Sequence, residues 1–171
     1  MIEMFRVTQP ADINAVVLLA REIWEEHYVP IIGREQVDYM LDKFQSAPAI
    51  AQQMENGYEY YLAMNGPQRA GYFALVPDPA AFKTLLSKLY VRQTQRGHGT
   101  GKAIMAFVEQ RCLELGVREL WLTVNRHNKD AIAFYQSMGF TKSERVVQDI
   151  GNGFVMDDYK MVKSVGSPAP P

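Results

Sequence analysis

The spacing of apolar residues changes several times along the chain, and each spacing predicts a different kind of element. Apolar positions recur at helical intervals up to residue 24 in a helix that Pro10 and Asp12 open, and again over residues 34–44. Residues 49–55 predict another helical turn or two. Residues 4–8 form a short first strand, and residues 58–64 and 69–76 favour a β-hairpin around a turn at 65–67. A strand is expected next at residues 85–91.

The second half of the chain continues the mixed pattern. A strongly periodic helix follows Gly101 and ends at Gly116, and a buried strand is expected at residues 119–124. Asn128 caps a further helix that ends at Gly139, and two strands at 141–148 and 154–162 flank a glycine-rich turn. The order β, α, α, β, β, β, α, β, α, β, β predicts an α/β (mixed α+β) fold. Its central mixed sheet has about six to seven strands, flanked by about four helices.

The length and composition bound the domain organisation. A chain of 171 residues that is 47% hydrophobic can bury one sizeable core, so a single domain is expected over residues 1–163. Residues 164–171 consist of small residues and proline with little to bury. A disordered tail is expected there.

Charge and composition argue against several classes of partner. The 18 basic and 19 acidic residues leave a net charge of −1, which gives no attraction to nucleic acid or anionic membranes. The basic stretch at residues 92–96 has no nucleic-acid recognition motif around it. No apolar run approaches the roughly 20 residues that span a bilayer, and no signal peptide is evident. A cytoplasmic protein is therefore expected.

The single cysteine and the histidines carry no predicted chemistry. Cys112 excludes an internal disulfide, and it falls on the apolar face of the long helix, which favours inert packing over nucleophilic use. The three histidines and the cysteine show no metal-ligand spacing, so no metal is expected. His127 is expected to face solvent.

The most informative segment is residues 89–102, LYVRQTQRGHGTGK, where a strand ends, three alternate glycines follow and a long helix begins. Glycines allow close approach of a ligand, and a helix N-terminus offers unpaired N–H donors and a positive dipole, which suits a pyrophosphate. A P-loop is excluded, because Arg96 stands where its first glycine belongs and Ala103 where Ser or Thr belongs. A dinucleotide fingerprint fails at Lys102.

Two motifs in this region resemble a known family. Arg96-x-x-Gly99-x-Gly101, placed directly after the strand, resembles the acetyl-CoA motif of the GNAT superfamily of N-acetyltransferases. Asn128 opens a helix with Tyr135 seven residues later, which is similar to the family's other signature. That spacing places both residues on one helix face, two turns apart. The resemblance covers about residues 85–140, and the order of the flanking elements agrees along nearly the whole chain.

The resemblance implies an enzyme that moves an acetyl group from acetyl-CoA, its co-substrate, to a primary amine. It implies that the pantetheine arm lies between the strand before the glycine loop and the strand after the helix. The expected cofactor-binding residues are Leu89, Tyr90 and Val91 for the acetyl and pantetheine part, Gly97, His98, Gly99, Thr100, Gly101 and Lys102 for the pyrophosphate, Arg96 for added charge and Asn128 for the cofactor arm. A backbone N–H near Val91 is the expected oxyanion donor. Tyr135 is the expected general acid, because a phenol with a pKa of about 10 can protonate a departing thiolate.

The general base is left open by the sequence. Some relatives place a glutamate five residues before the motif asparagine, but Thr123 stands there, and residues 85–91 contain no carboxylate. A water chain or groups at residues 25–27 or 157–158 could serve. The missing carboxylate motivates an alternative function, a catalytically silent acyl-CoA-binding regulatory module.

The acceptor amine is also open. Residues 24–28 and 154–159 place aromatic side chains beside carboxylates, a combination that suits a cationic amine. These segments faintly resemble bacterial polyamine acetyltransferases. A polyamine, another small-molecule amine such as an aminoglycoside or an amino-acid derivative, and a protein N-terminal amine all remain candidates. The resemblance further implies a homodimer.

Overall fold

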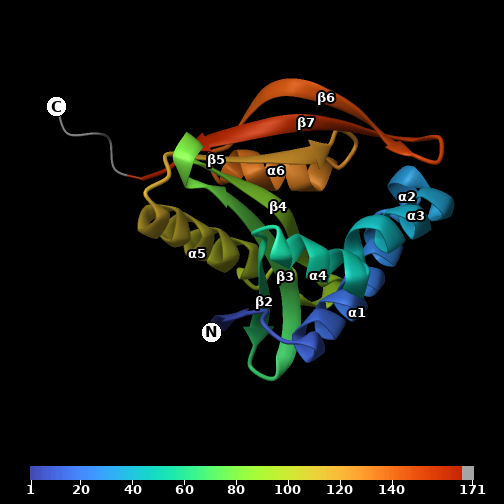
Figure 1. Cartoon of the computed structure of the whole chain (residues 1–171), viewed down its shortest axis with the longest axis horizontal. Coiled ribbons are helices and arrows are strands. Elements are labelled where there is room, and N and C mark those ends of the chain that lie inside the picture. The colour runs from blue at the N-terminus through green and yellow to red at the C-terminus, as the bar shows by residue number, and fades with distance from the viewer. Residues whose placement is uncertain (167–171) are drawn as a thin grey trace. The chain divides into compact units, whose positions relative to one another are not determined.

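The computed structural model describes residues 1–166, in which helices and strands combine in the mixed α/β fold predicted from the sequence. Seven strands follow the hydrogen-bonded order β1-β2-β3-β4-β5-β7-β6 (Figure 1). The strands are β1 (Ile2–Arg6), β2 (Glu59–Asn65), β3 (Gln68–Asp78), β4 (Lys83–Val91), β5 (Glu119–Asn125), β6 (Thr141–Gly151) and β7 (Phe154–Ser164). The helices are α1 (Pro10–His27), α2 (Val29–Ile32), α3 (Arg34–Gln45), α4 (Ala47–Glu55), α5 (Thr100–Leu115) and α6 (Lys129–Ser137), with short 3-10 turns η1 (Pro79–Ala81) and η2 (Gln93–Gln95).

The chain divides into two compact units. The first comprises residues 1–76 and 88–107, and the second comprises residues 77–87 and the chain from residue 108 onward. Strands β3 and β4 and helix α5 contribute residues to both units. The single domain predicted for residues 1–163 stays a prediction.

The first unit is built on the antiparallel strands β1, β2 and β3. Tyr61 of β2 lies opposite Phe73 of β3, and their rings stack with centroids 4.9 Å apart. Phe107 meets both rings edge-on. The helical spacing read from the sequence is confirmed in α1, whose buried residues include Val16 and Ile23. This apolar face fixes α1 in the core of the first unit.

The described residues contain six helices rather than about four. The added ones are α2, which was not expected, and α4, where residues 49–55 were expected to give only a turn or two. Pro30 and Pro48 each lie in the first turn of one of these short helices. Proline is tolerated there because the first N–H groups of a helix have no intrahelical partner. The Ser46 hydroxyl then caps α4 by accepting from the Ala49 N–H at 3.3 Å.

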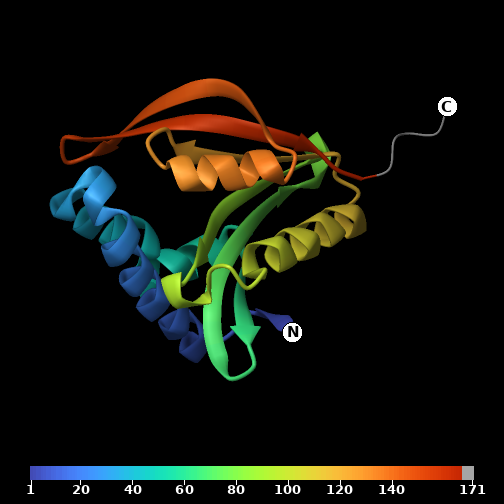
Figure 2. The same cartoon turned by 180° about the vertical axis from the view of Figure 1, so that it is seen from behind.

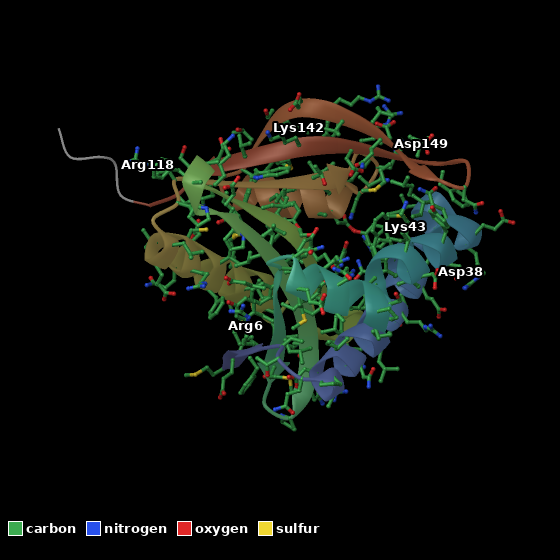
Figure 3. All side chains as sticks on the ribbon, in the orientation of Figure 1. Arg6, Asp38, Lys43, Arg118, Lys142 and Asp149 are labelled. Atoms are coloured by element: carbon green, nitrogen blue, oxygen red, sulfur yellow. The ribbon has the colours of Figure 1, made fainter. Side chains whose placement is uncertain are left out.

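The second unit is organised around β5, which runs parallel to β4 on one side and antiparallel to β7 on the other. Strands β6 and β7 form a long hairpin, and α6 runs alongside β5 (Figures 1 and 2). On β6, Lys142 lies over the Tyr159 ring of β7 with its ammonium 4.4 Å from the centroid (labelled in Figure 3). Leu120, Leu122 and Met161 are fully buried and form the core.

The first two residues of the predicted tail belong to the hydrogen-bonded structure at the end of β7. Ser164 is the last residue of β7 and pairs with Glu119, and the Val165 N–H donates to the Arg118 carbonyl at 2.9 Å. Residues 167–171 of the predicted disordered tail lie outside the described residues. Across residues 1–166, no helix combines the length and the apolar character that crossing a membrane requires.

Candidate functional site

The glycine loop, defined as residues 96–102, belongs to the first unit, and its last residues, from Thr100 onward, form the start of α5. Gly97 and Gly99 have φ angles of 80° and 79°, in the left-handed region that side chains with a Cβ rarely adopt. Thr100 begins the helix, is buried, and donates from its hydroxyl to the Gln95 carbonyl at 3.3 Å. The alternating glycines therefore turn the backbone sharply at the point where the helix begins.

This turn leaves a row of backbone donors available. Among the described residues, no N–H of residues 97–102 donates a backbone hydrogen bond, and the first to do so is Ala103, whose N–H reaches the Gly99 carbonyl at 2.9 Å. A Cβ built on Gly97 or Gly99 would meet no atom within 4 Å, so both glycines face open space. Unpaired amides at the positive end of a 16-residue helix favour an anion. The loop therefore fits the diphosphate of a coenzyme A.

The charged side chains of the glycine loop lie around these amides. Arg96, His98 and Lys102 are all exposed, and Arg96 donates from Nε to the Val91 carbonyl at 3.3 Å. Two of them carry a positive charge at neutral pH, so they would add to the attraction of the helix dipole for a diphosphate. His98 needs only its backbone amide for the predicted role.

The end of β4, where Leu89, Tyr90 and Val91 are half-buried, is held by an unusually close neighbour. A Cβ on Gly71 of β3 would lie 2.3 Å from the Tyr90 carbonyl oxygen, so only glycine fits there. The Tyr90 ring meets Trp24 edge-on, with centroids 5.5 Å apart. The close packing at Gly71 was not predicted, because a single glycine within a strand is the only sequence feature that marks it.

Asn128 and Tyr135 lie in the second unit, at the start and on the second turn of α6. The predicted cap is confirmed, because the Asn128 side-chain oxygen accepts from the Ala131 N–H at 3.4 Å. Tyr135 is 8% exposed, and its ring meets Phe134 and Phe140 edge-on at 5.5 Å and 5.6 Å. Both residues are largely buried and share one helix face. Thr123, five residues before Asn128, is exposed on β5.

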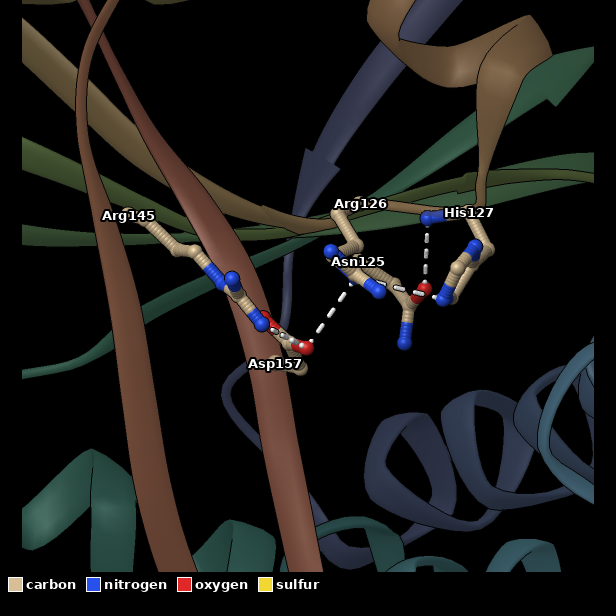
Figure 4. Close-up of polar contacts among 5 residues, drawn as sticks. All are labelled: Asn125, Arg126, His127, Arg145 and Asp157. Carbon is tan, nitrogen blue, oxygen red and sulfur yellow. Dashed lines mark hydrogen bonds and ion pairs between the residues drawn. The ribbon is translucent and has the colours of Figure 1, made fainter.

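Asp157 and Asp158 are neighbours in β7 with opposite environments. Asp157 is held by Arg145, whose Nε and Nη2 lie 2.9 Å and 2.7 Å from its oxygens, and by Arg126 at 3.0 Å (Figure 4). The hydrogen bond from Arg145, reinforced by the charge of Arg126, lowers the pKa of Asp157. Asp158 is only 5% exposed, and burial raises its pKa to about 6, helped by the negative charge of Asp157. Sequence analysis treated the two acids as one pair, whereas the strand turns them to opposite faces.

The segment at residues 24–28, expected to contact the acceptor, forms an aromatic group in the first unit. Trp24 stacks on Tyr28 with centroids 4.5 Å apart, and Tyr28 meets Tyr90 edge-on at 6.0 Å. Glu25 and Glu26 are exposed beside them, and Glu25 lies 3.7 Å from Arg34. The aromatic group thus joins α1 to the strand that precedes the glycine loop.

The cysteine lies in the core and His127 lies at the surface. Cys112 is fully buried in α5, which confirms packing as its role. His127 is exposed, as expected. Within residues 1–166, no group of three or more His, Cys, Asp and Glu side chains is arranged to hold a metal ion.

The sequence matches the acetyltransferase (GNAT) family over residues 19–140, and the chain belongs to that family. This confirms the resemblance carried by the glycine loop and by the motif at residues 128–135. The protein is thus an acyl-CoA-dependent acetyltransferase by family, with acetyl-CoA as its co-substrate.

Individual relatives agree with this assignment. An uncharacterized N-acetyltransferase of Lactobacillus delbrueckii subsp. lactis is 25% identical over 149 residues, covering 82% of this chain and 86% of the relative. The PaiA N-acetyltransferase of Thermoplasma acidophilum, solved in complex with coenzyme A, shares the fold with a TM-score of 0.78 at 22% identity over 96% of this chain and 99% of its own. The ribosomal-protein-S18-alanine N-acetyltransferase of Escherichia coli has a TM-score of 0.73 at 16% identity, over 99% and 97% of the two chains.

Proposed function

We propose that this chain transfers the acetyl group of acetyl-CoA to a primary amine by direct attack, with Tyr135 as the general acid. The observation that carries the proposal is the row of unpaired amides at residues 97–102, placed at the N-terminus of α5. Such a row binds a diphosphate without any side-chain chemistry, because N–H groups and the helix dipole both favour negative charge. Arg96 and Lys102 add two exposed cations.

The remaining proposed cofactor contacts come from β4, the strand before the glycine loop, and from Asn128, the helix cap after β5. Leu89, Tyr90 and Val91 would contact the acetyl and pantetheine part, which pairs with backbone as an added strand does. A backbone N–H near Val91 would stabilise the oxyanion of the tetrahedral intermediate. Asn128 would hold the cofactor arm through its side-chain amide. The burial of Asn128, 3% exposed, supports a fixed orientation for that amide.

Tyr135 has the environment that a positioned proton donor needs. Its ring is buried between Phe134 and Phe140, and those edge-on contacts fix the ring plane and thus the direction of the hydroxyl. When the amine nitrogen bonds to the acetyl carbon, the C–S bond breaks and the sulfur needs a proton. The Tyr135 phenol would supply that proton.

The acceptor is proposed to be a cationic primary amine, either a polyamine or another small amine, or the N-terminal amine of a protein. Two exposed carboxylates, Glu25 and Glu26, lie in the sequence between Trp24 and Tyr28, whose rings stack in the first unit. Aromatic faces and carboxylates both attract an alkylammonium. The solved relative named for acetylating the alanine of a ribosomal protein supports a protein amine as an alternative. The homodimer and the cytoplasmic location stay predictions.

The proposal is tested by incubating the protein with acetyl-CoA and a panel of amines, namely spermidine, kanamycin and a peptide that begins with alanine. Release of free CoA thiol, together with the mass of one added acetyl group on the amine, is the expected result. The same titration without amine measures acetyl-CoA affinity. Tight acetyl-CoA binding with no acetylated product from any amine would favour the silent regulatory module, for which Thr123 in place of a carboxylate is the supporting observation.

A further inference from the structure

The proposed reaction needs a group that removes a proton from the acceptor ammonium, and the sequence positions where relatives carry a carboxylate hold none. A carboxylate lies one strand away instead. Asp158 of β7 is the cross-strand partner of Asn125, and Thr123 pairs with Lys160, two residues further along β7. Cross-strand partners and residues two apart share a face of a sheet. Asp158 therefore lies on the same face of the sheet as Thr123, and Thr123 acts to lower the pKa of its carboxyl group.

Asp158 is a buried acid without a cationic partner among the ion pairs of the described residues. Both nearby arginines, Arg126 and Arg145, pair with Asp157 on the other face. Burying a carboxylate that no cation neutralises is unfavourable for folding. Two adjacent acids driven to opposite pKa shifts are a pattern that marks acid–base sites.

Strand β5, which pairs with β7 at Asp158, is paired with β4 over only part of its length. Within the second unit, β4 pairs with β5 only over residues 83–85 against 119–121, and the pairing does not extend to Leu86 and Ser87. Thr123 lies beyond that last pair and is exposed. In the proposed function, the pantetheine arm occupies this gap, so its thioester end would pass the face that carries Thr123 and Asp158.

We propose that the carboxylate of Asp158 is the general base of the reaction, oriented by the hydroxyl of Thr123. The inference rests on the proposed function. Asp158 takes one proton from the acceptor ammonium and the freed lone pair forms the N–C bond. The C–S bond then breaks, and the sulfur takes the Tyr135 proton. The second proton lost from nitrogen restores the phenol, and Asp158 releases its proton to water, so amide, CoA thiol and one proton result.

The pH dependence of this step follows from the groups around Asp158 in its unit. Lys160 and Glu144 lie on the same face, with their charged atoms 4.0 Å apart, and Asp157 is the adjacent acid in sequence. A base must be ionised, so the rate should rise with pH as Asp158 loses its proton near pH 6. Thr123 lowers the pKa of Asp158, so loss of its hydroxyl should move this rise to higher pH.

The test compares kcat/KM against pH for the wild type, Asp158→Asn and Glu144→Gln, with the best amine of the panel. Asp158→Asn should lower kcat/KM about 100-fold at pH 7, within the range that general base catalysis provides. The loss should shrink toward pH 10, where the free amine no longer needs a base. Calorimetric acetyl-CoA affinity should stay within about 2-fold of the wild type, since Asp158 is not proposed to bind the cofactor. Glu144→Gln, which removes a carboxylate from the same face, should keep the wild-type profile.

A second variant keeps the inference testable should Asp158→Asn fail to fold. Thr123→Val should shift the acidic limb of the profile to higher pH, and carbon NMR titration of the Asp158 carboxyl should show the same shift without any substrate. An Asp158→Asn enzyme with wild-type kcat/KM, or one whose loss is equal at pH 7 and pH 10, would overturn the assignment. Absence of acetyl transfer by the wild type itself would instead contradict the proposed function, so the two failures are distinguishable.

Discussion

Lys88 donates a hydrogen bond from its Nζ to the backbone carbonyl of Phe44 at 2.8 Å, which ties β4 to the end of α3 inside the first unit. The same ammonium contacts the Gln53 side-chain oxygen at 2.9 Å and the Tyr60 hydroxyl. These three acceptors match the three N–H donors of an ammonium. No ion pair among the described residues includes Lys88, and burial lowers its pKa to about 7.

The lowered pKa of Lys88 predicts how stability depends on pH. Between about pH 7 and 10.5 the unfolded chain carries a proton on Lys88 that the folded chain lacks, so the free energy of unfolding rises with pH there. The total gain is at most about 5 kcal/mol. Urea unfolding of the wild type and of Lys88→Met should show the wild type gaining stability relative to the variant from pH 7 to pH 10. A difference that is constant over this range would contradict the burial argument.

Gly99→Val should weaken acetyl-CoA binding about 10- to 100-fold, because valine is strained at a φ of 79° and its branched side chain would project where the diphosphate must approach. Calorimetry measures the affinity. Gly57→Val is the matched control, since Gly57 has a φ of 96° and equally open surroundings in the turn before β2. The control should lose stability but keep its acetyl-CoA affinity. Equal acetyl-CoA affinities in the wild type and both variants would show that the glycine loop is not part of the binding site.

Tyr135→Phe should lower kcat about 100-fold while acetyl-CoA affinity stays unchanged, because the substitution removes the proton donor and keeps the ring. Tyr58→Phe removes a half-buried phenol from the first unit and serves as the control. Stopped-flow measurement of thiol release gives the turnover of each protein. A turnover number equal to that of the wild type would show that Tyr135 is not the proton donor.

Asp158→Asn should also change stability, independently of any substrate. Burial raises the pKa of Asp158 from 3.8 to about 6, so its contribution to stability is complete below pH 3.8 and is lost as pH rises through 6. At pH 8 the ionised acid should cost about 2 to 3 kcal/mol, which the amide avoids. In thermal unfolding, the stability of Asp158→Asn relative to the wild type should therefore increase from pH 4 to pH 7. A relative stability that instead decreases over this range would indicate that the fold stabilises the charged form of Asp158.

The motifs with strong local signals were readable from the sequence. The run of alternate glycines predicted an open loop directly before a long helix, and Gly97 and Gly99 adopt positive φ angles where α5 begins. Asn128 predicted a cap, because its side chain competes for helix N–H groups whatever the tertiary context. In these segments the local backbone preference and the fold agree, so the spacing of a few residues was sufficient.

The features that depend on tertiary neighbours were not readable. Asp157 and Asp158 look equivalent in sequence. Their difference arises from Arg126, just after β5, and Arg145 of β6, which pair with Asp157, and from the burial of Asp158 on the other face. Lys88 falls in the strand expected at residues 85–91, yet nothing local shows that its ammonium contacts Gln53 and Tyr60. The environment of a charged side chain is set by residues far away in the chain, so spacing alone cannot predict it.

Amide NMR with added acetyl-CoA reports on the backbone of the glycine loop itself. The largest shifts should fall on the N–H groups of residues 97–102, which have no backbone acceptor in the described chain. Acetyl-pantetheine, which lacks the diphosphate, should leave these signals nearly unchanged while still perturbing Val91 and its neighbours. Acetyl-CoA that binds while the signals of residues 97–102 stay in place would contradict the proposed role of the glycine loop.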